Sequence, residues 1–325
     1  MTPSLAAVAA GDFSHFLRHF CDAGLAAKQV APGMLQLLRE HSNLSLLLSI
    51  GVHGDETAPI EIVTQLLDAL VIDPQRLAIN LMIVVGNPAA IALARRFVEV
   101  DLNRLFKPDP IDSAPSLEAE RARQIMQLSR QFFEATEATR WHLDLHTAIR
   151  PSIYPTFAIV PAVVPVQQKK ALMHLLGHAA IRAVILSRSA AHTFSTFTAE
   201  QLGATSATLE LGQISKLGAN VPNEFQDIAK TLAALCQNSI PAEAPPQMPL
   251  LFALAQEIIK TSDAFTLQID HTAPNFSPLA PDTIIATDGA HSYRVGPFEE
   301  RIVFPNPAVQ IGQRAGLMVV PSVLS

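Results

Sequence analysis

The sequence predicts an α/β protein with a larger domain of three layers and a smaller, β-rich domain after it. Apolar runs typical of buried strands alternate with amphipathic helical stretches between residues 44 and 212. Such alternation builds a mostly parallel sheet with helices on both faces. Proline density then rises over residues 239–250, as in a linker between compact units. We therefore predict a first domain over residues 1–242 and a second over residues 243–325.

The first strands and helices are predicted in the following order. Residues 44–52 form a continuous apolar run, GDETAP is turn-like, and residues 60–70 have helical periodicity. Residues 77–85 form a second buried apolar run, which Gly86 and Pro88 end. Residues 116–136 predict a charged amphipathic helix, because Ser116 is a good N-cap and acidic residues follow it in the first turns.

Three further strands and one helix complete the first domain. We predict strands at residues 141–148, 182–187 and 207–212, and a helix at residues 167–181. Alternation along the first of these strands places His142, Asp144 and His146 on one face. After the linker, short apolar runs separated by turn residues predict the β-rich domain, at residues 265–269, 283–287, 301–305 and 316–321.

The composition narrows the classes of function. The chain has 325 residues, of which 49% are hydrophobic and 16% charged, and it carries a net charge of -6. It can bury a large core, and it offers no overall basic field for nucleic acid, which we do not expect as a partner. The two cysteines, Cys21 and Cys236, suggest no disulfide framework, so we expect a cytoplasmic location. Residues 157–166 are apolar but too short to span a bilayer, and we expect no membrane contact.

His53 and Glu56 are candidate metal ligands in the motif GVHGDETA. They follow a predicted strand and stand three residues apart on a tight loop. Imidazole nitrogen and carboxylate oxygen both bind zinc, and a catalytic zinc needs a third protein ligand and an open position for water. His146, at the end of another predicted strand, is the candidate. His142 competes with it, but a strand places His146 nearer the ligand-binding edge, so we interpret His142 as structural.

Two other groups of residues carry candidate chemistry. Asn103 and Arg104, in DLNR, offer donors for a substrate carboxylate, although a surface ion-pair cluster is an equal alternative. Asp101 or Asp144 can accept a hydrogen bond from the second ring N–H of a zinc-bound histidine. Glu210 lies in the apolar run ATLELG, and a carboxylate in such surroundings can serve as a general base.

Four motifs in this order, GVHGDETAP, DLNRLF, RWHLDLHTAIR and TLELG, resemble the succinylglutamate desuccinylases. These belong to the aspartoacylase family, which is related to zinc carboxypeptidases. The likeness runs from about Leu44 to Gly212, and FPNPAVQIGQRAGLMV near the end also resembles the family. It implies a zinc-carboxypeptidase-like α/β/α catalytic domain and a C-terminal barrel-sandwich hybrid domain.

The resemblance also implies roles for single residues. His53, Glu56 and His146 would bind one Zn²⁺ per subunit, and Glu210 would be the catalytic base. Further roles follow from the same motifs: Arg96 would stabilise the oxyanion, Asn103 and Arg104 would bind the substrate's α-carboxylate, and Asp101 would orient His53.

The expected reaction is hydrolysis of N-succinyl-L-glutamate, the last step of arginine degradation by the succinyl pathway. HTAIR after the third ligand follows the desuccinylase form and favours this substrate over acetylaspartate. Another N-acyl amino-acid deacylase, a peptidase and a non-catalytic zinc- or carboxylate-binding protein are the alternatives. The metal loaded in the cell and any homo-oligomer stay open. So does the residue that meets the distal succinyl carboxylate, for which the candidates are Arg150, Lys216, His192 and His271.

Overall fold

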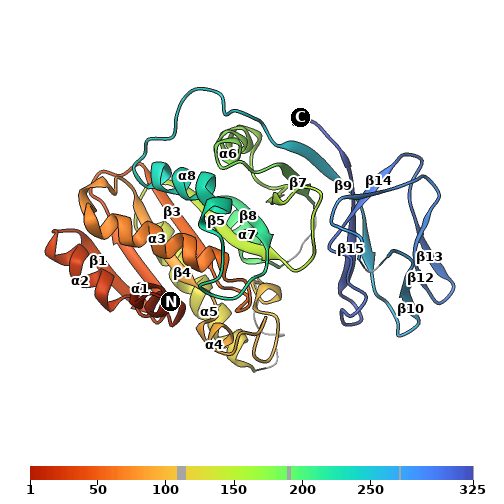
Figure 1. The fold of residues 1–325 in the computed structure, drawn as a ribbon, viewed down its shortest axis with the longest axis horizontal. Coiled ribbons are helices and arrows are strands. Elements are labelled where there is room, and N and C mark those ends of the chain that lie inside the picture. The colour runs from red at the N-terminus through yellow and green to blue at the C-terminus, as the bar shows by residue number, and fades with distance from the viewer. Residues whose placement is uncertain (108–114, 189–191, 271, 325) are drawn as a thin grey trace.

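The computed structural model describes residues 1–107, 115–188, 192–270 and 272–324. His271 therefore lies outside the described residues. Figure 1 shows a larger body, on the left, in which helices surround strands, and a group of strands from the C-terminal quarter on the right. A single connection after the last helix leads from one to the other (Figure 1).

Eight strands of the larger body form a mixed sheet in the order β1-β2-β4-β3-β5-β8-β6-β7. Their bounds are β1 Ala26–Ala31, β2 Met34–Leu38, β3 Leu44–Ile50, β4 Asn80–Val85, β5 Thr139–Ala148, β6 Thr156–Pro161, β7 Ala183–Ser187 and β8 Thr205–Gln213. The pairs β3–β4, β3–β5 and β5–β8 are parallel. The carboxyl ends of β3, β5 and β8 therefore meet at one edge, where open α/β sheets bind their ligands.

Helices cover both faces of this sheet. One core cluster joins the sheet to residues of α1 Pro3–Ala9, α2 Ser14–Asp22, α3 Ala58–Ile72, α6 Val166–His178 and α8 Gln226–Cys236. A second cluster joins the opposite face to α5 Leu117–Glu134 and α7 Phe194–Leu202. The short helix α4, Pro88–Ala92, follows β4, and single 3-10 turns lie at η1 Pro74–Arg76, η2 Leu102–Arg104 and η4 Pro222–Phe225. The three-layer α/β/α architecture predicted from the sequence is confirmed.

Sequence patterning explains the elements that position the site. Ser116 caps α5, because its Oγ accepts a hydrogen bond from the Ala119 amide at 3.1 Å. Along β5, Leu143 and Leu145 pack in the first core cluster, while His142, Asp144 and His146 alternate with them and are also buried. The alternation expected of this strand is confirmed, and it turns three polar side chains toward the α5 and α7 layer.

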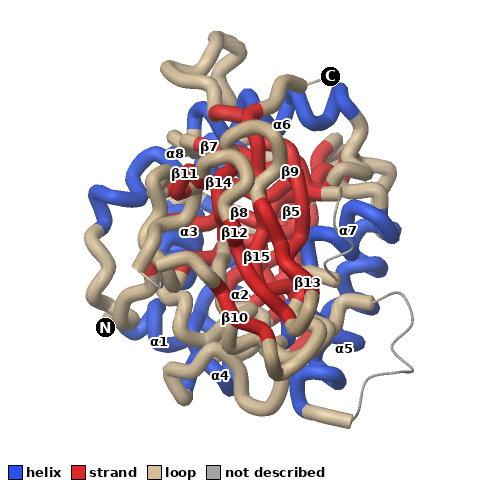
Figure 2. The backbone as a smooth tube through the Cα atoms, turned by 90° about the vertical axis from the view of Figure 1, so that its right-hand side faces the viewer, coloured by secondary structure: helices blue, strands red, loops and turns tan. Residues whose placement is uncertain are grey.

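The C-terminal quarter is built of strands, as expected. Their bounds are β9 Leu250–Ile259, β10 Phe265–Leu267, β11 Ser277–Leu279, β12 Ile284–Asp288, β13 His291–Arg294, β14 Glu300–Val303 and β15 Arg314–Pro321. β10, β12 and β13 form a separate antiparallel sheet. The others continue the central sheet, because β9 pairs in parallel with β7 and antiparallel with β15, and β14 and β11 follow. Seen from this end, strands fill the middle and helices lie on both sides (Figure 2).

Within the described residues, no helix combines the length and the apolar composition needed to cross a bilayer.

Asp288 supports the loop between β9 and β10. Its carboxylate accepts hydrogen bonds from the Thr261 amide at 2.6 Å, from the Thr261 hydroxyl at 2.7 Å, and from the Ser262 hydroxyl. The side-chain hydrogen bonds from Ser262 and Thr261 lower the pKa of Asp288 to about 2. A carboxyl with a lowered pKa stabilises the fold when ionised, and this contribution disappears as the pH falls from 3.8 through about 2.

Asp288→Asn is therefore expected to lower the Tm at pH 7, because an amide nitrogen cannot accept these hydrogen bonds. Thermal unfolding of both proteins should show the Tm difference shrinking as the pH drops below 4 toward about 2. Asp282→Asn, at an exposed turn position, is the matched control and should leave the Tm unchanged. A Tm difference for Asp288→Asn that is as large at pH 2 as at pH 7 would contradict the assigned role.

Candidate metal centre and active site

The loop after β3 carries the first two candidate ligands. Gly51, at a φ of 58°, turns the chain away from the strand, and His53 and Glu56 follow before α3 begins at Ala58. Gly54 between them lies against the backbone of α4, since an added Cβ would be 2.2 Å from the Ala90 carbonyl carbon. The close approach requires glycine at this position. The loop is thereby held at the carboxyl end of β3.

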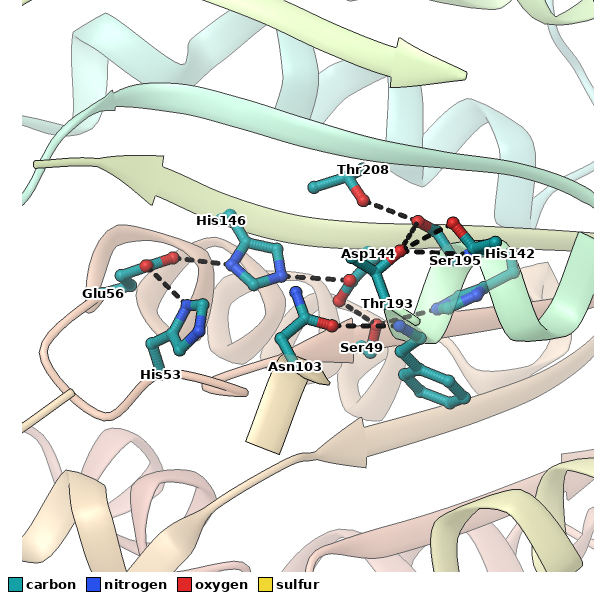
Figure 3. Close-up of polar contacts among 12 residues, drawn as sticks. Ser49, His53, Glu56, Asn103, His142, Asp144, His146, Thr193, Ser195 and Thr208 are labelled. Carbon is teal, nitrogen blue, oxygen red and sulfur yellow. Dashed lines mark hydrogen bonds and ion pairs between the residues drawn. The ribbon is translucent and has the colours of Figure 1, made fainter. Parts of the chain in front are cut away.

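His146 completes a buried cluster with these two residues. One ligand atom from each of His53, Glu56 and His146 lies within 4.8 Å of the other two. His53 Nδ1 is 2.7 Å from Glu56 Oε1, and His146 Nδ1 is 2.8 Å from Glu56 Oε2. Figure 3 shows both imidazole rings turned toward the Glu56 carboxylate. The three side chains are 2–3% exposed. Two imidazole nitrogens and a carboxylate oxygen in a buried cluster fit a divalent cation such as zinc.

Each histidine holds a carboxylate at its other ring nitrogen. His53 Nε2 is 3.0 Å from Asp101 Oδ1, and His146 Nε2 is 3.0 Å from Asp144 Oδ2. A carboxylate only accepts, so both Nε2 atoms carry a hydrogen. Each Nδ1 atom faces the Glu56 carboxylate and would present a lone pair to the cluster once a metal ion takes the place of its hydrogen. The sequence left open which aspartate serves which histidine, and this geometry gives one partner to each.

Glu210 lies next to the cluster on β8. It stands opposite His146 in the parallel register of β5 and β8. The residue is 8% exposed, and its Oε2 has no hydrogen-bond partner among the described residues. Burial and the nearby Glu56 carboxylate raise the pKa of Glu210 to about 7. A buried carboxylate oxygen without a partner is costly in a folded protein and often marks a functional group.

Arg96 brings a positive charge to the same place. Its Nη1 donates to Glu56 Oε1 at 2.9 Å, and its Nη2 lies 3.9 Å from Asp101 Oδ2. Its side chain is 30% exposed. Burial opposes the charge on Arg96, but the carboxylates of Glu56 and Asp101 outweigh it and raise the pKa of the guanidinium. The structure thus brings Arg96 together with the residues of the cluster.

The predicted substrate clamp lies on η2, directly after Asp101. Asn103 is 4% exposed, and its Oδ1 accepts a hydrogen bond from the Phe194 amide at 2.9 Å. Arg104 is exposed, and its Nη1 donates to the Asn103 carbonyl at 2.9 Å. The backbone of α7 therefore fixes Asn103, while the guanidinium next to it faces the solvent.

Arg150 is placed differently. Its guanidinium donates at 3.0 Å to the carbonyl oxygens of Ala273 and Pro305, both in the C-terminal quarter. It lines a cavity of about 480 Å³ together with Ser152, Gly212, Gln213, Ser215, Asn220 and others. Among the described residues, those lining this cavity do not include His53, Glu56, His146 or Glu210. The structure therefore does not bring Arg150 into the ligand cluster. Lys216 and His192 are both exposed.

Comparisons with known proteins agree with the fold. Residues 42–236 match the family model for the succinylglutamate desuccinylase/aspartoacylase catalytic domain, and residues 247–322 match the AstE/AspA barrel-sandwich hybrid domain. The chain is 40% identical to the succinylglutamate desuccinylase of Burkholderia thailandensis over 283 residues, which are 86% of this chain and 80% of the relative.

Solved structures give the same result. The succinylglutamate desuccinylase of Vibrio cholerae superposes with a TM-score of 0.84 at 32% identity, covering 92% of this chain and 88% of the other. That of Chromobacterium violaceum superposes with a TM-score of 0.80 at 35% identity, covering 95% and 98%. The chain belongs to the succinylglutamate desuccinylase/aspartoacylase family.

Proposed function

We propose that the chain is a zinc-dependent amidohydrolase that cleaves N-succinyl-L-glutamate to succinate and L-glutamate. The observation that carries the proposal is the buried His53–Glu56–His146 cluster with the unpartnered Glu210 carboxylate beside it. Two relatives that are 40% and 38% identical over 86% and 92% of the chain are named for this reaction, which supports the same substrate here. Zn²⁺ held by the three ligands would supply a Lewis acid and lower the pKa of a water molecule at the site.

Side chains of the protein transfer the protons and bind the negatively charged groups of the substrate. Glu210 takes a proton from the attacking water at Oε2 and delivers it to the amide nitrogen, so that the C–N bond breaks and glutamate leaves as the amine. Arg96, whose guanidinium donates to Glu56 at 2.9 Å, stabilises the negative charge that develops on the carbonyl oxygen. Asn103 and Arg104 bind the α-carboxylate of the glutamate portion. Arg150, Lys216 and His192 stay candidates for the distal succinyl carboxylate.

Three other functions are distinguished by simple assays. A different N-acyl amino-acid deacylase would prefer another acyl donor, and a peptidase would cleave peptides with free C-termini. A binding protein would retain the ligands and the clamp but would have no use for a buried base. The raised pKa of Glu210, which burial and the Glu56 carboxylate cause, favours an enzyme over a binding protein.

Arg104→Ala is expected to raise KM for succinylglutamate about tenfold or more, because a charge-assisted contact to a carboxylate is lost. Steady-state kinetics on the zinc-loaded proteins measure KM and kcat separately. Arg95→Ala removes another exposed arginine of the same segment and should leave both constants unchanged. An unchanged KM in Arg104→Ala would remove Arg104 from the substrate clamp.

A further inference from the structure

A chain of buried polar side chains continues from Asp144 away from the candidate ligands. Ser49 Oγ, on β3, donates to Asp144 Oδ1 at 2.5 Å. His142 Nε2, on β5, lies 2.8 Å from the same Ser49 oxygen. His142 Nδ1 lies 2.7 Å from Thr198 Oγ1, on α7. Ser49, His142, Asp144 and Thr198 are all 0% exposed. Figure 3 shows dashed lines that lead from His146 to Asp144, then to Ser49 and then to His142.

The direction of each hydrogen bond follows from the chemistry of the groups. The Asp144 carboxylate only accepts, so the single proton of Ser49 points to Asp144. The Ser49 oxygen must then accept from His142, and the His142 Nε2 carries a hydrogen. Burial lowers the pKa of His142 to about 4, so its Nδ1 is an acceptor at neutral pH and Thr198 donates to it. The three hydrogen bonds are therefore donated in one direction: from Thr198 on α7 to His142, from His142 to Ser49, and from Ser49 to Asp144.

Full burial of Asp144 explains why it needs this chain. Its Oδ2 accepts from His146 Nε2, and its Oδ1 requires a protein donor, because no solvent reaches it. Asp101, which faces His53, has a side chain that is 19% exposed, and its Oδ1 also accepts from the Asn103 amide at 2.9 Å. The two histidines are thus oriented by different means: one by a carboxylate near solvent and one by a fully buried carboxylate held by Ser49.

We infer that Ser49 and His142 are positioning residues that fix the Asp144 carboxylate and through it the metal-facing Nδ1 of His146. The inference rests on the proposed role of His146 as a ligand. Among the described residues, the side-chain hydrogen bonds of Ser49 and His142 go to Asp144, to Thr198 and to each other, and not to the three ligands, so the two residues act through Asp144. Removing the hydrogen bonds of Ser49 and His142 leaves all three ligands in place but frees the His146 ring to rotate or to change tautomer, which weakens its bond to a metal ion.

Metal binding by the purified full chain tests this directly. Zinc affinity is measured by competition with a chromophoric chelator, and the d–d absorption spectrum of the Co²⁺-substituted protein reports the ligand geometry. Ser49→Ala is expected to weaken zinc binding about tenfold and to shift the Co²⁺ spectrum, as loss of an outer partner does in other metal sites. Ser195→Ala is the matched control. It removes a hydroxyl of similar burial, which pairs with Thr208 at 2.7 Å and not with Asp144, and should leave both readouts unchanged.

A pair of substitutions at His142 separates hydrogen bonding from packing. Glutamine can donate to Ser49 from a nitrogen in nearly the place of Nε2, whereas leucine cannot donate at all. His142→Gln is therefore expected to keep more of the zinc affinity and of the native Co²⁺ spectrum than His142→Leu. This pair decides the matter even if Ser49→Ala does not fold.

Two results would overturn the inference: a wild-type affinity and spectrum in Ser49→Ala, or equal losses in His142→Gln and His142→Leu. Failure of the unsubstituted protein to bind zinc stoichiometrically would instead overturn the proposed metal site, and this inference with it.

Discussion

Glu210→Gln is expected to lower kcat by about a hundredfold to ten-thousandfold while zinc binding is retained. Glutamine has nearly the same shape as glutamate but cannot take a proton from water. The carboxylate is buried beside the ligand cluster, and its Oε2 lacks a partner among the described residues, so no donor among them competes with water for this oxygen. The pKa of Glu210, raised to about 7 by burial and by Glu56, suits both the uptake and the release of a proton.

The measurement pairs single-turnover kinetics with metal analysis of the same sample. Glu224→Gln serves as the control, because it alters an exposed glutamate in the cavity that Arg150 lines. It should leave kcat unchanged. Normal turnover by zinc-loaded Glu210→Gln would remove Glu210 from the mechanism, whereas loss of zinc would show that the residue contributes to the metal site instead.

His146→Ala is expected to abolish stoichiometric zinc binding and all turnover. His146 supplies one of the two imidazole nitrogens in the proposed site, and its removal also leaves Oδ2 of the buried Asp144 carboxylate without its donor. Loss of a ligand should therefore weaken binding by more than the roughly 10- to 100-fold typical of losing an outer partner. Elemental analysis after dialysis measures the zinc content, and thermal unfolding reports whether the variant folds.

His19→Ala provides the control for zinc bound elsewhere. His19 is an exposed histidine on α2, and its ring stacks edge-on against His15 at 4.7 Å. Its removal should change neither the zinc content nor the activity. Wild-type zinc stoichiometry in His146→Ala would mean that the metal binds at another place, and the assignment of His53, Glu56 and His146 would fail.

Local patterns predicted the elements that carry the site. The apolar run at residues 44–52 became β3, the Ser116 cap became the start of α5, and alternation in WHLDLHTA placed three polar residues on one face of β5. Each of these signals lies within one element, where periodicity and capping are read directly from the sequence. The motif spacing also placed His53, Glu56 and His146 together, since parallel strands end at a common edge.

Pairings between distant segments were not predicted. The first strand of the β1–β2 hairpin has no buried position, and Lys28 and Gln29 interrupt its apolar residues, so no apolar run marks it in the sequence. The sequence predicts β6 only as part of an apolar stretch too short for a membrane, because its partners on β8 lie 49 to 55 positions away. The bond between Ser49 and Asp144 joins positions 95 residues apart. The sequence favours a structural role for His142, because a strand places His146 nearer the ligand-binding edge, but the partners of His142 on β3 and α7 are visible only in the folded chain.

The boundary at residue 242 stays a prediction. The family models leave residues 237–246 between their two matches, and β9 begins at Leu250. β9 nevertheless pairs with β7 of the larger body, so the C-terminal strands are bonded directly to the central sheet. A linker composition marks where helical periodicity stops, but it carries no information about which strand the chain pairs with next.

The most direct test of the proposed function is the release of glutamate from N-succinylglutamate. The protein is stripped of metal with a chelator, reloaded with zinc, and assayed side by side on N-succinylglutamate, N-acetylglutamate and N-acetylaspartate. We expect no turnover without metal, and zinc-restored turnover that is fastest on N-succinylglutamate. Stoichiometric zinc binding without cleavage of any of the three substrates would contradict the proposed function.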